Sequence, residues 1–384
     1  MYRTKVAGYG CVPIGEHWDS SLLDLGVAAI QSLSTQGNVS QADVLVVGNM
    51  LAGSLNHQEN LATAIADRAG LSGIETMKVE AACASGAAAV KAGFALISSG
   101  LAKRVIVLGL EKMTDRSAET VTSAISQAND FEAETIFGAT SSSLVAMLSQ
   151  VYTAETDATE RDLSFFAVNA YRNATATPWS MFKGEVTQET WDKSQVIIPP
   201  LRLLDCPANS DGAAAIILER MEDDSQQDCI EVLASNGASD VMAIANRPQM
   251  LRFAAVEKAL SRSLELAGVT SSDIDVFELH DAFPVVAAIC LEAAGYAKPG
   301  EGWRYGGDIE SKSRPLPAIQ TMGGIKGKGH PLGATGIYQI VDACTQLAGK
   351  AGVNQIHDAT TAMTLALGGL ASTAYATVLR KSKS

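Results

Sequence analysis

The chain contains two weakly similar halves, and this internal repeat limits the possible folds more than any other feature. In each half an amphipathic helix leads through a polar segment into a strand, and an apolar helix then leads into a second strand. These elements are residues 22–33, 44–48, 84–99 and 104–108 in the first half, and 253–267, 274–279, 333–347 and 360–367 in the second. The repeat predicts two related α/β units that pack around a pseudo-twofold axis.

The composition excludes several classes of protein. With 384 residues, 47% hydrophobic and 18% charged, the chain can bury a large core. A net charge of −13 argues against general binding to nucleic acid, because phosphates require a basic surface. The six cysteines lack paired C-x-x-C spacing, so we expect neither a zinc site nor a disulfide framework. We find no 18-residue window of membrane-spanning hydropathy and no signal peptide, and we expect a cytoplasmic protein.

Cys83 lies where an extended run, 76–82, meets the alanine-rich helix 84–99. At a helix N-terminus, free backbone N–H groups and the positive end of the helix dipole favour a thiolate. We therefore expect the pKa of Cys83 to be lowered toward neutrality, and Cys83 to act as a nucleophile. The alternative is a small cysteine buried at a tight helix start.

A glycine-rich segment, 323–336, precedes the second apolar helix and contains His330. Pro331 favours a helix entry, and Gly329 allows the imidazole to project from the turn and to serve as a general base for a thiol. A thiolate–imidazolium pair is one way to activate a cysteine. The alternative is a glycine-rich cap with a structural histidine. A phosphate loop is not expected, because the Walker pattern is absent.

A second histidine, His280, comes directly after the strand 274–279 and is followed by Asp281. His280 could donate a hydrogen bond to a thioester oxygen, directly or through water, while Asp281 could fix its tautomer or cap the next helix. The backbone N–H groups of Leu367-Gly368-Gly369 could form an oxyanion hole with that of Cys83. For His280 the alternative is a plain helix cap, and for the two glycines it is a bulge or turn.

The domain organisation follows from the repeat and from an extra stretch between its parts. Residues 113–202 show no strong strand alternation, and we interpret them as a loop domain over the active face. An apolar run, 211–218, reads as a strand covered on both faces and closes the first half. We therefore predict one half from residues 1–112 and 203–226, and the other from 227–384.

Together these motifs resemble those of thiolases, above all the archaeal-type and sterol-carrier-protein-type branch, over nearly the whole chain. The matching segments are residues 47–50, 57–60, 80–86, 109–115, 137–139, 209–215, 280–283 and 329–331. The resemblance implies a five-layered αβαβα fold, a homodimer or homotetramer, and coenzyme A bound as a substrate under the loop domain. It also implies that Cys83 carries the acyl group, that His330 activates it, and that His280 polarises the thioester oxygen.

Two positions depart from the family pattern. Many thiolases have a second cysteine in a Cys-x-Gly motif, where this chain has Ala366, and the sterol-carrier-protein type can place one after His-Asp, where this chain has Ala282. Archaeal-type thiolases share this lack, and some work with a small partner protein built from an OB-fold and a zinc ribbon. Such a partner is therefore possible here.

The sequence thus predicts a cysteine acyltransferase that cleaves 3-ketoacyl-CoA or forms it by Claisen condensation, with acetyl-CoA and acetoacetyl-CoA as default substrates. One alternative is an acyl-transferring enzyme without carbon–carbon chemistry, suggested by the missing second cysteine. Another is a non-catalytic or lyase-type subunit that serves a partner. No tightly bound cofactor and no metal are expected, and the residues that bind coenzyme A cannot be named from the sequence.

Overall fold

The computed structural model describes residues 2–33, 37–222, 229–306 and 316–382. Its strands are β1 (Thr4–Cys11), β2 (Val44–Gly48), β3 (Glu75–Val79), β4 (Arg104–Glu111), β5 (Val196–Ile198), β6 (Leu201–Arg202), β7 (Gly212–Arg220), β8 (Ile230–Ser239), β9 (Val276–Glu278), β10 (Ala318–Ile319), β11 (Thr361–Gly368) and β12 (Thr373–Lys381). Its helices are α1 (Leu22–Ser32), α2 (Ala52–Asn56), α3 (Leu61–Arg68), α4 (Ser85–Ser99), α5 (Ala118–Ser126), α6 (Ser141–Glu155), α7 (Glu160–Ala174), α8 (Gln188–Asp192), α9 (Ala254–Ala267), α10 (Pro284–Ala293), α11 (Gly324–Lys328) and α12 (Leu332–Leu347).

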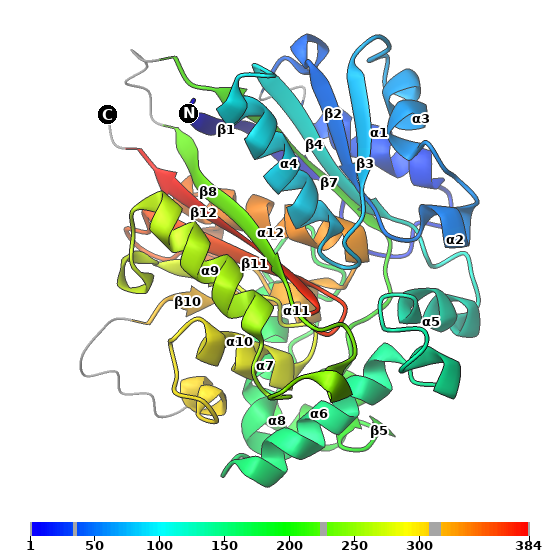
Figure 1. The fold of residues 1–384 in the computed structure, drawn as a ribbon, viewed down its shortest axis with the longest axis vertical. Coiled ribbons are helices and arrows are strands. Elements are labelled where there is room, and N and C mark those ends of the chain that lie inside the picture. The colour runs from blue at the N-terminus through cyan, green and yellow to red at the C-terminus, as the bar shows by residue number, and fades with distance from the viewer. Residues whose placement is uncertain (1, 34–36, 223–228, 307–315, 383–384) are drawn as a thin grey trace.

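The two halves repeat the same sheet. In the first, β3, β2 and β4 are parallel, and β7 and β1 follow antiparallel; in the second, β10, β9, β11, β12 and β8 repeat that order and direction. A short antiparallel pairing between β1 and β8 joins the two (Figure 1). The predicted pseudo-repeat is therefore present in the topology.

Five layers result from this arrangement. Helices α1 and α3 cover the outer face of the first half-sheet, α4 and α12 lie between the half-sheets, and α9 and α10 cover the second (Figure 1). Strand alternation explains the packing: in β2, Leu45 and Val47 face α1 and α3, whereas Val44 and Val46 face the central helices. The predicted five-layered αβαβα architecture is confirmed.

Helix α4 with the residues before it, 82–99, corrects the expectation about membrane spans. This stretch has a mean hydropathy of 1.3 over 18 residues, long and apolar enough to cross a membrane, and it is the one such stretch in the described part of the chain. It is mostly buried between the half-sheets and against α12. Its apolar character is accounted for by its place as a central core helix.

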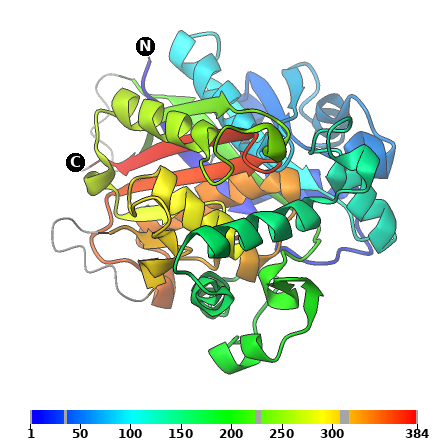
Figure 2. The same cartoon turned by 60° about the horizontal axis from the view of Figure 1, so that its bottom comes forward.

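Between β4 and β7 the chain forms α5 to α8 and the small β5–β6 ribbon. Figure 2 shows this segment coming forward at one end of the sheets. Thr159 and Asp162 form a capping box at the start of α7, the helix that the spacing and the acidic first turn predict for 159–172. Helices α5 and α6 reach the ends of α4 and α12, where the predicted site residues lie.

Candidate active site

Cys83 lies in a tight turn between β3 and α4, beside the helix N-terminus that the sequence predicts. Ala82 has a left-handed backbone with a φ of 51°, a conformation that costs a non-glycine residue about 1 kcal/mol. The Ala82 N–H donates to the Glu80 carboxylate at 2.6 Å. The Ser85 hydroxyl accepts from the Ala81 N–H at 2.9 Å and donates to the Ala82 carbonyl at 2.6 Å. These bonds hold the strained turn and thereby fix the position of Cys83.

The surroundings of Cys83 disfavour a thiolate, so the expected lowering of its pKa is wrong. Burial, followed by the negative charge of Glu111, raises the pKa of the thiol to about 12. A hydrogen bond from its own backbone N–H acts in the opposite direction, and Glu80 raises the pKa further. The positive end of α4 is a partial charge, and it does not outweigh the loss of solvent and the nearby acidic side chains.

Glu111 is a site residue that the sequence analysis did not single out. It ends β4 and is fully buried, and its carboxylate accepts from the N–H groups of Met50, Leu51 and Gly333 at 3.0–3.1 Å. Asn49 adds a side-chain donor at 2.8 Å. Burial raises the pKa of Glu111 to about 7, although these backbone bonds oppose the rise. The sequence feature that could have indicated Glu111 is a charged residue at the end of an apolar strand.

His330 stands where the glycine-rich segment enters α12. Gly329 has a φ of 102°, and a Cβ there would meet Ile14 at 2.8 Å and Ser210 at 2.9 Å, so only glycine fits. Pro331 is the N-cap of α12, as expected. The imidazole Nδ1 lies 2.9 Å from the Thr335 hydroxyl. Burial, with His280 and then Lys326, lowers the pKa of His330 well below its usual value, which keeps the ring neutral at pH 7.

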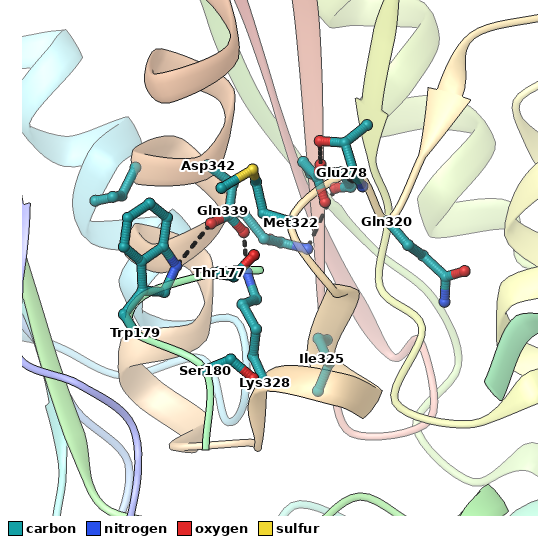
Figure 3. A network of polar contacts seen from close by, with 12 residues as sticks. Thr177, Trp179, Ser180, Glu278, Gln320, Met322, Ile325, Lys328, Gln339 and Asp342 are labelled. Carbon is teal, nitrogen blue, oxygen red and sulfur yellow. Dashed lines mark hydrogen bonds and ion pairs between the residues drawn. The ribbon is translucent and has the colours of Figure 1, made fainter. Parts of the chain in front are cut away.

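Two groups of polar contacts, one at Asp342 and one at Gln339, anchor the framework around His330 (Figure 3). Lys328 forms a buried ion pair with Asp342 of α12, which also accepts from the Trp179 indole at 3.0 Å. Gln339 of α12 donates to the carbonyls of Glu278 and Leu279, at 3.2 and 3.1 Å, and to that of Leu365 at 2.9 Å. Helix α12 therefore holds the ends of β9 and β11, from which the second histidine and the glycine pair follow.

His280 accepts a hydrogen bond from the Leu367 N–H at its Nδ1, at 3.3 Å. Its proton therefore resides on Nε2, which makes that atom a donor. Burial lowers the pKa of His280 to about 3. Asp281 neither fixes this tautomer nor caps α10: its carboxylate accepts from the N–H of Ile325 at 2.7 Å, in α11, and from the Gln320 amide at 2.5 Å.

The structure brings Cys83, His280 and His330 to one cavity of about 190 Å³. The two imidazole rings are 5.6 Å apart between centroids and edge to face. The loop segment supplies a hydroxyl-rich wall from α5, α6 and the N-cap of α6, made of Thr122, Ser126, Thr140, Ser141 and Ser142. The opposite wall is apolar and includes Phe253, Phe283 and Leu370. A thiol, a neutral base and an N–H donor thus surround a space of acyl-group size.

The structure also shows where the two glycines lie and where the two alanines lie that stand in place of a second cysteine. Gly369 lines the cavity, whereas Gly368 ends β11 and packs so closely on the Ala81 carbonyl that a Cβ would collide with it. The oxyanion hole of Cys83 and Gly368 stays a prediction. Ala282 lines the cavity, and Ala366 is buried against the start of α4. Among the described residues that line the cavity, Cys83 is the one cysteine.

Known protein families match both halves. Residues 4–222 match the model for "Thiolase, N-terminal domain", and residues 236–381 match "Thiolase C-terminal domain-like". The chain is 38% identical to the acetyl-CoA acetyltransferase of Methanocaldococcus jannaschii over 90% of each chain. It is also 38% identical to the acetyl-CoA acetyltransferase of Methanothermobacter thermautotrophicus, over 97% of this chain and 98% of the relative.

Solved structures share the fold over almost the full length. One, titled "Ltp2-ChsH2(DUF35) aldolase", has a TM-score of 0.81 at 22% identity and covers 99% of this chain and 98% of its own. Another, human mitochondrial 3-ketoacyl-CoA thiolase in complex with CoA, has a TM-score of 0.73 at 17% identity with the same coverage.

Proposed function

The chain belongs to the thiolase family, and we propose that this acyl-CoA acyltransferase uses Cys83 to accept the acyl group of acetyl-CoA or acetoacetyl-CoA. One observation carries the proposal: a cysteine and two histidines from three distant segments meet at a single cavity. The names of the two archaeal relatives support the choice of acetyl-CoA.

In this proposal each of the three side chains has a role. His330, neutral at pH 7, takes the proton from the Cys83 thiol as the sulfur attacks the thioester carbonyl. His280 presents Nε2–H, which donates to the oxygen that gains negative charge. When the tetrahedral intermediate collapses, the bond to the coenzyme A sulfur breaks and His330 returns the proton to that sulfur. The products are acyl-Cys83 and free coenzyme A.

The acyl group then passes either to the thiol of free coenzyme A or to the α-carbon of a second acetyl-CoA. In the cleavage direction the Cys83 sulfur attacks the 3-keto carbonyl of acetoacetyl-CoA, the bond between C2 and C3 breaks, and the leaving acetyl-CoA carbanion takes the proton held by His330. Condensation needs a base for that α-carbon, and no second cysteine is present at the cavity among the described lining residues. His280 carries its proton on the Nε2 atom, so His330 is the base that remains. His330 takes the α-proton, the carbanion attacks the acyl carbonyl, and the bond between that carbonyl carbon and the Cys83 sulfur breaks. The leaving sulfur then recovers the proton from His330, which restores the thiol and the neutral imidazole.

A second recess offers coenzyme A a path from the surface. This recess of about 530 Å³ lies between α5 and the start of α6, and it shares Thr122, Ser126 and Thr140 with the active-site cavity. We propose that the pantetheine arm enters through this recess, with its amides facing the hydroxyl groups. The structural relative solved with CoA supports binding of the same substrate by this fold.

We also propose that the chain assembles with other subunits. Strand β3 is the edge of the sheet and is only partly covered, which suits pairing with a second copy in a homodimer. The aldolase relative, whose title names a second component, supports a partner protein as well. Phe131, Ile136 and Phe137 are exposed near the recess and would suit such a contact. Light scattering of the purified chain measures the homo-oligomer directly.

Intact-mass spectrometry tests the function. The protein is mixed with acetyl-CoA or acetoacetyl-CoA, and released coenzyme A is followed, with the Cys83→Ser variant as control. An acetyl adduct on Cys83, with acetoacetyl-CoA consumed when coenzyme A is added, is the expected result. An adduct without carbon–carbon cleavage or condensation would favour the simple acyl-transfer alternative, for which the alanines at 282 and 366 are the motivating observation. Failure of every thioester to label Cys83 would refute the assignment.

A further inference from the structure

Two buried charged side chains of opposite sign lie beside the proposed catalytic pair. Glu111 lies on the Cys83 side, at the start of α12, and Lys326 lies four residues before His330. A negative charge on Glu111 disfavours a thiolate at Cys83, and the positive charge of Lys326 disfavours a protonated His330. Each side chain therefore opposes one member of a thiolate–imidazolium pair. These charges bear on catalysis only if Cys83 and His330 have the roles proposed for them, so the inference rests on the proposed function.

Lys326 has no evident structural task. Its side chain is 0% exposed, and its ammonium forms no hydrogen bond with the described residues. The other lysine of the glycine-rich segment, Lys328, is equally enclosed but is paired with Asp342 (Figure 3). A buried, unpaired ammonium is costly, so its retention calls for a role other than packing.

The ammonium of Lys326 lies against the active site. It stands 5.5 Å from the centre of the Phe283 ring, and Phe283 lines the cavity with His280 and His330. The carboxylates around it are engaged elsewhere. Asp281 accepts the Ile325 N–H, and Asp205 accepts the Trp191 indole at 2.8 Å. Its positive charge therefore lies one aromatic side chain away from the cavity, and it acts on His330.

Glu111 places a carboxyl group on the opposite side, and this group becomes negatively charged as the pH rises through its raised pKa of about 7. Its carboxylate is held by the N–H groups of Met50, Leu51 and Gly333, while Met50 and Leu332 pack with Cys83 in one apolar cluster. It occupies the N-terminus of α12, so its carboxylate offsets the positive end of that second helix. The positive end of α12 therefore offers little attraction to a thiolate at Cys83.

We propose that Glu111 and Lys326 are positioning residues that act together with burial to hold the resting site as a neutral thiol and a neutral imidazole, so that Cys83 becomes nucleophilic only when a thioester fills the cavity. His330 then receives the thiol proton during attack, and the new charge develops on the acyl oxygen rather than on sulfur. The groups that act on His330 are His280 and Lys326, and those that act on Cys83 are Glu111 and Glu80. Cys206, Asp205 and Asp281 act on Lys326.

The test is the rate at which iodoacetamide alkylates Cys83, followed by mass spectrometry between pH 5 and 10. The wild-type rate should rise steadily toward high pH, without the plateau at neutral pH that an ion pair produces. Lys326→Met removes the charge and keeps the shape, and it should raise the rate at pH 7 several-fold, because His330 then accepts the thiol proton more readily. Lys326→Arg keeps the charge and should remain near the wild-type rate.

A neutral plateau in the wild-type protein would overturn the inference, and this result does not depend on any variant folding. The inference would also be overturned if the Lys326→Met protein had wild-type thermal stability and its Cys83 reacted with iodoacetamide at the wild-type rate. The proposed function fails in a different way. If Cys83 shows the expected alkylation profile but accepts no acyl group from acetyl-CoA or acetoacetyl-CoA, the electrostatic arrangement stands and the substrate assignment falls.

Discussion

Replacing Gly336 by alanine should separate the two helices that carry the site. Gly336 lies where α12 crosses α4, and a Cβ there would be 2.5 Å from the Ala87 backbone nitrogen and 2.9 Å from the Ala87 Cβ. Ordinary contacts of this kind are 3.4–4 Å, so the helices must move apart by roughly 1 Å. Cys83 and His330 precede the first turns of these helices, and a displacement of about 1 Å in an active site can cost on the order of 100-fold in rate.

Stability should change less than activity in this variant. Alanine is favoured over glycine within a helix by about 1 kcal/mol, whereas overpacking a core costs about 1–3 kcal/mol. The two terms offset each other in part, leaving a loss of at most about 2 kcal/mol.

Gly26→Ala is the matched control. Its added Cβ would meet only the ends of the Ile65 and Leu110 side chains, at 3.1 Å, and it lies in the outer helix α1. Thermal unfolding and the rate of Cys83 acylation are measured for both variants. If Gly336→Ala acylates at the wild-type rate, close packing of α4 on α12 does not set the geometry of the site.

Three further predictions concern the chemistry. Cys83→Ser should abolish the acyl adduct seen by intact-mass spectrometry, and full turnover in this variant would show that the nucleophile is elsewhere. His330→Ala should slow acylation by about 100-fold or more, measured by rapid-quench mass spectrometry, because the other imidazole at the cavity, His280, carries its proton on Nε2 and serves as a donor. Cys206→Ala and Cys344→Ala should leave acylation unchanged, since neither residue lines the cavity; a loss as large as that of Cys83→Ser would contradict this assignment.

The positions of helices and strands were largely predictable, because apolar periodicity decides them. Helices expected at 253–267 and 333–347 are observed at Ala254–Ala267 and Leu332–Leu347. The strand ends were less predictable. The run expected to extend to residue 82 ends at Val79, because the chain must turn sharply to present Cys83, and the hydrogen bonds of that turn come from Glu80 and Ser85 rather than from a strand partner.

The members of the site were predictable for a different reason. Cys83, His280 and His330 each follow a strand or precede a helix, and such ends meet at one edge of an α/β layer. Their protonation was not predictable, because it depends on burial in all three cases and, for Cys83, also on Glu111 at the end of β4. A helix N-terminus predicts a thiolate only while its surroundings are otherwise neutral.

The repeat explains why the catalytic pair is formed at all. Cys83 precedes α4 and His330 precedes α12, and these helices occupy equivalent places in the two halves. Their starts approach each other because small residues line the crossing: a Cβ on Gly86 would lie 2.6 Å from the Gly333 carbonyl. One equivalent position thus carries the nucleophile and the other carries the base. Chemistry that needs both therefore depends on the close contact between the halves, and neither half could perform it alone.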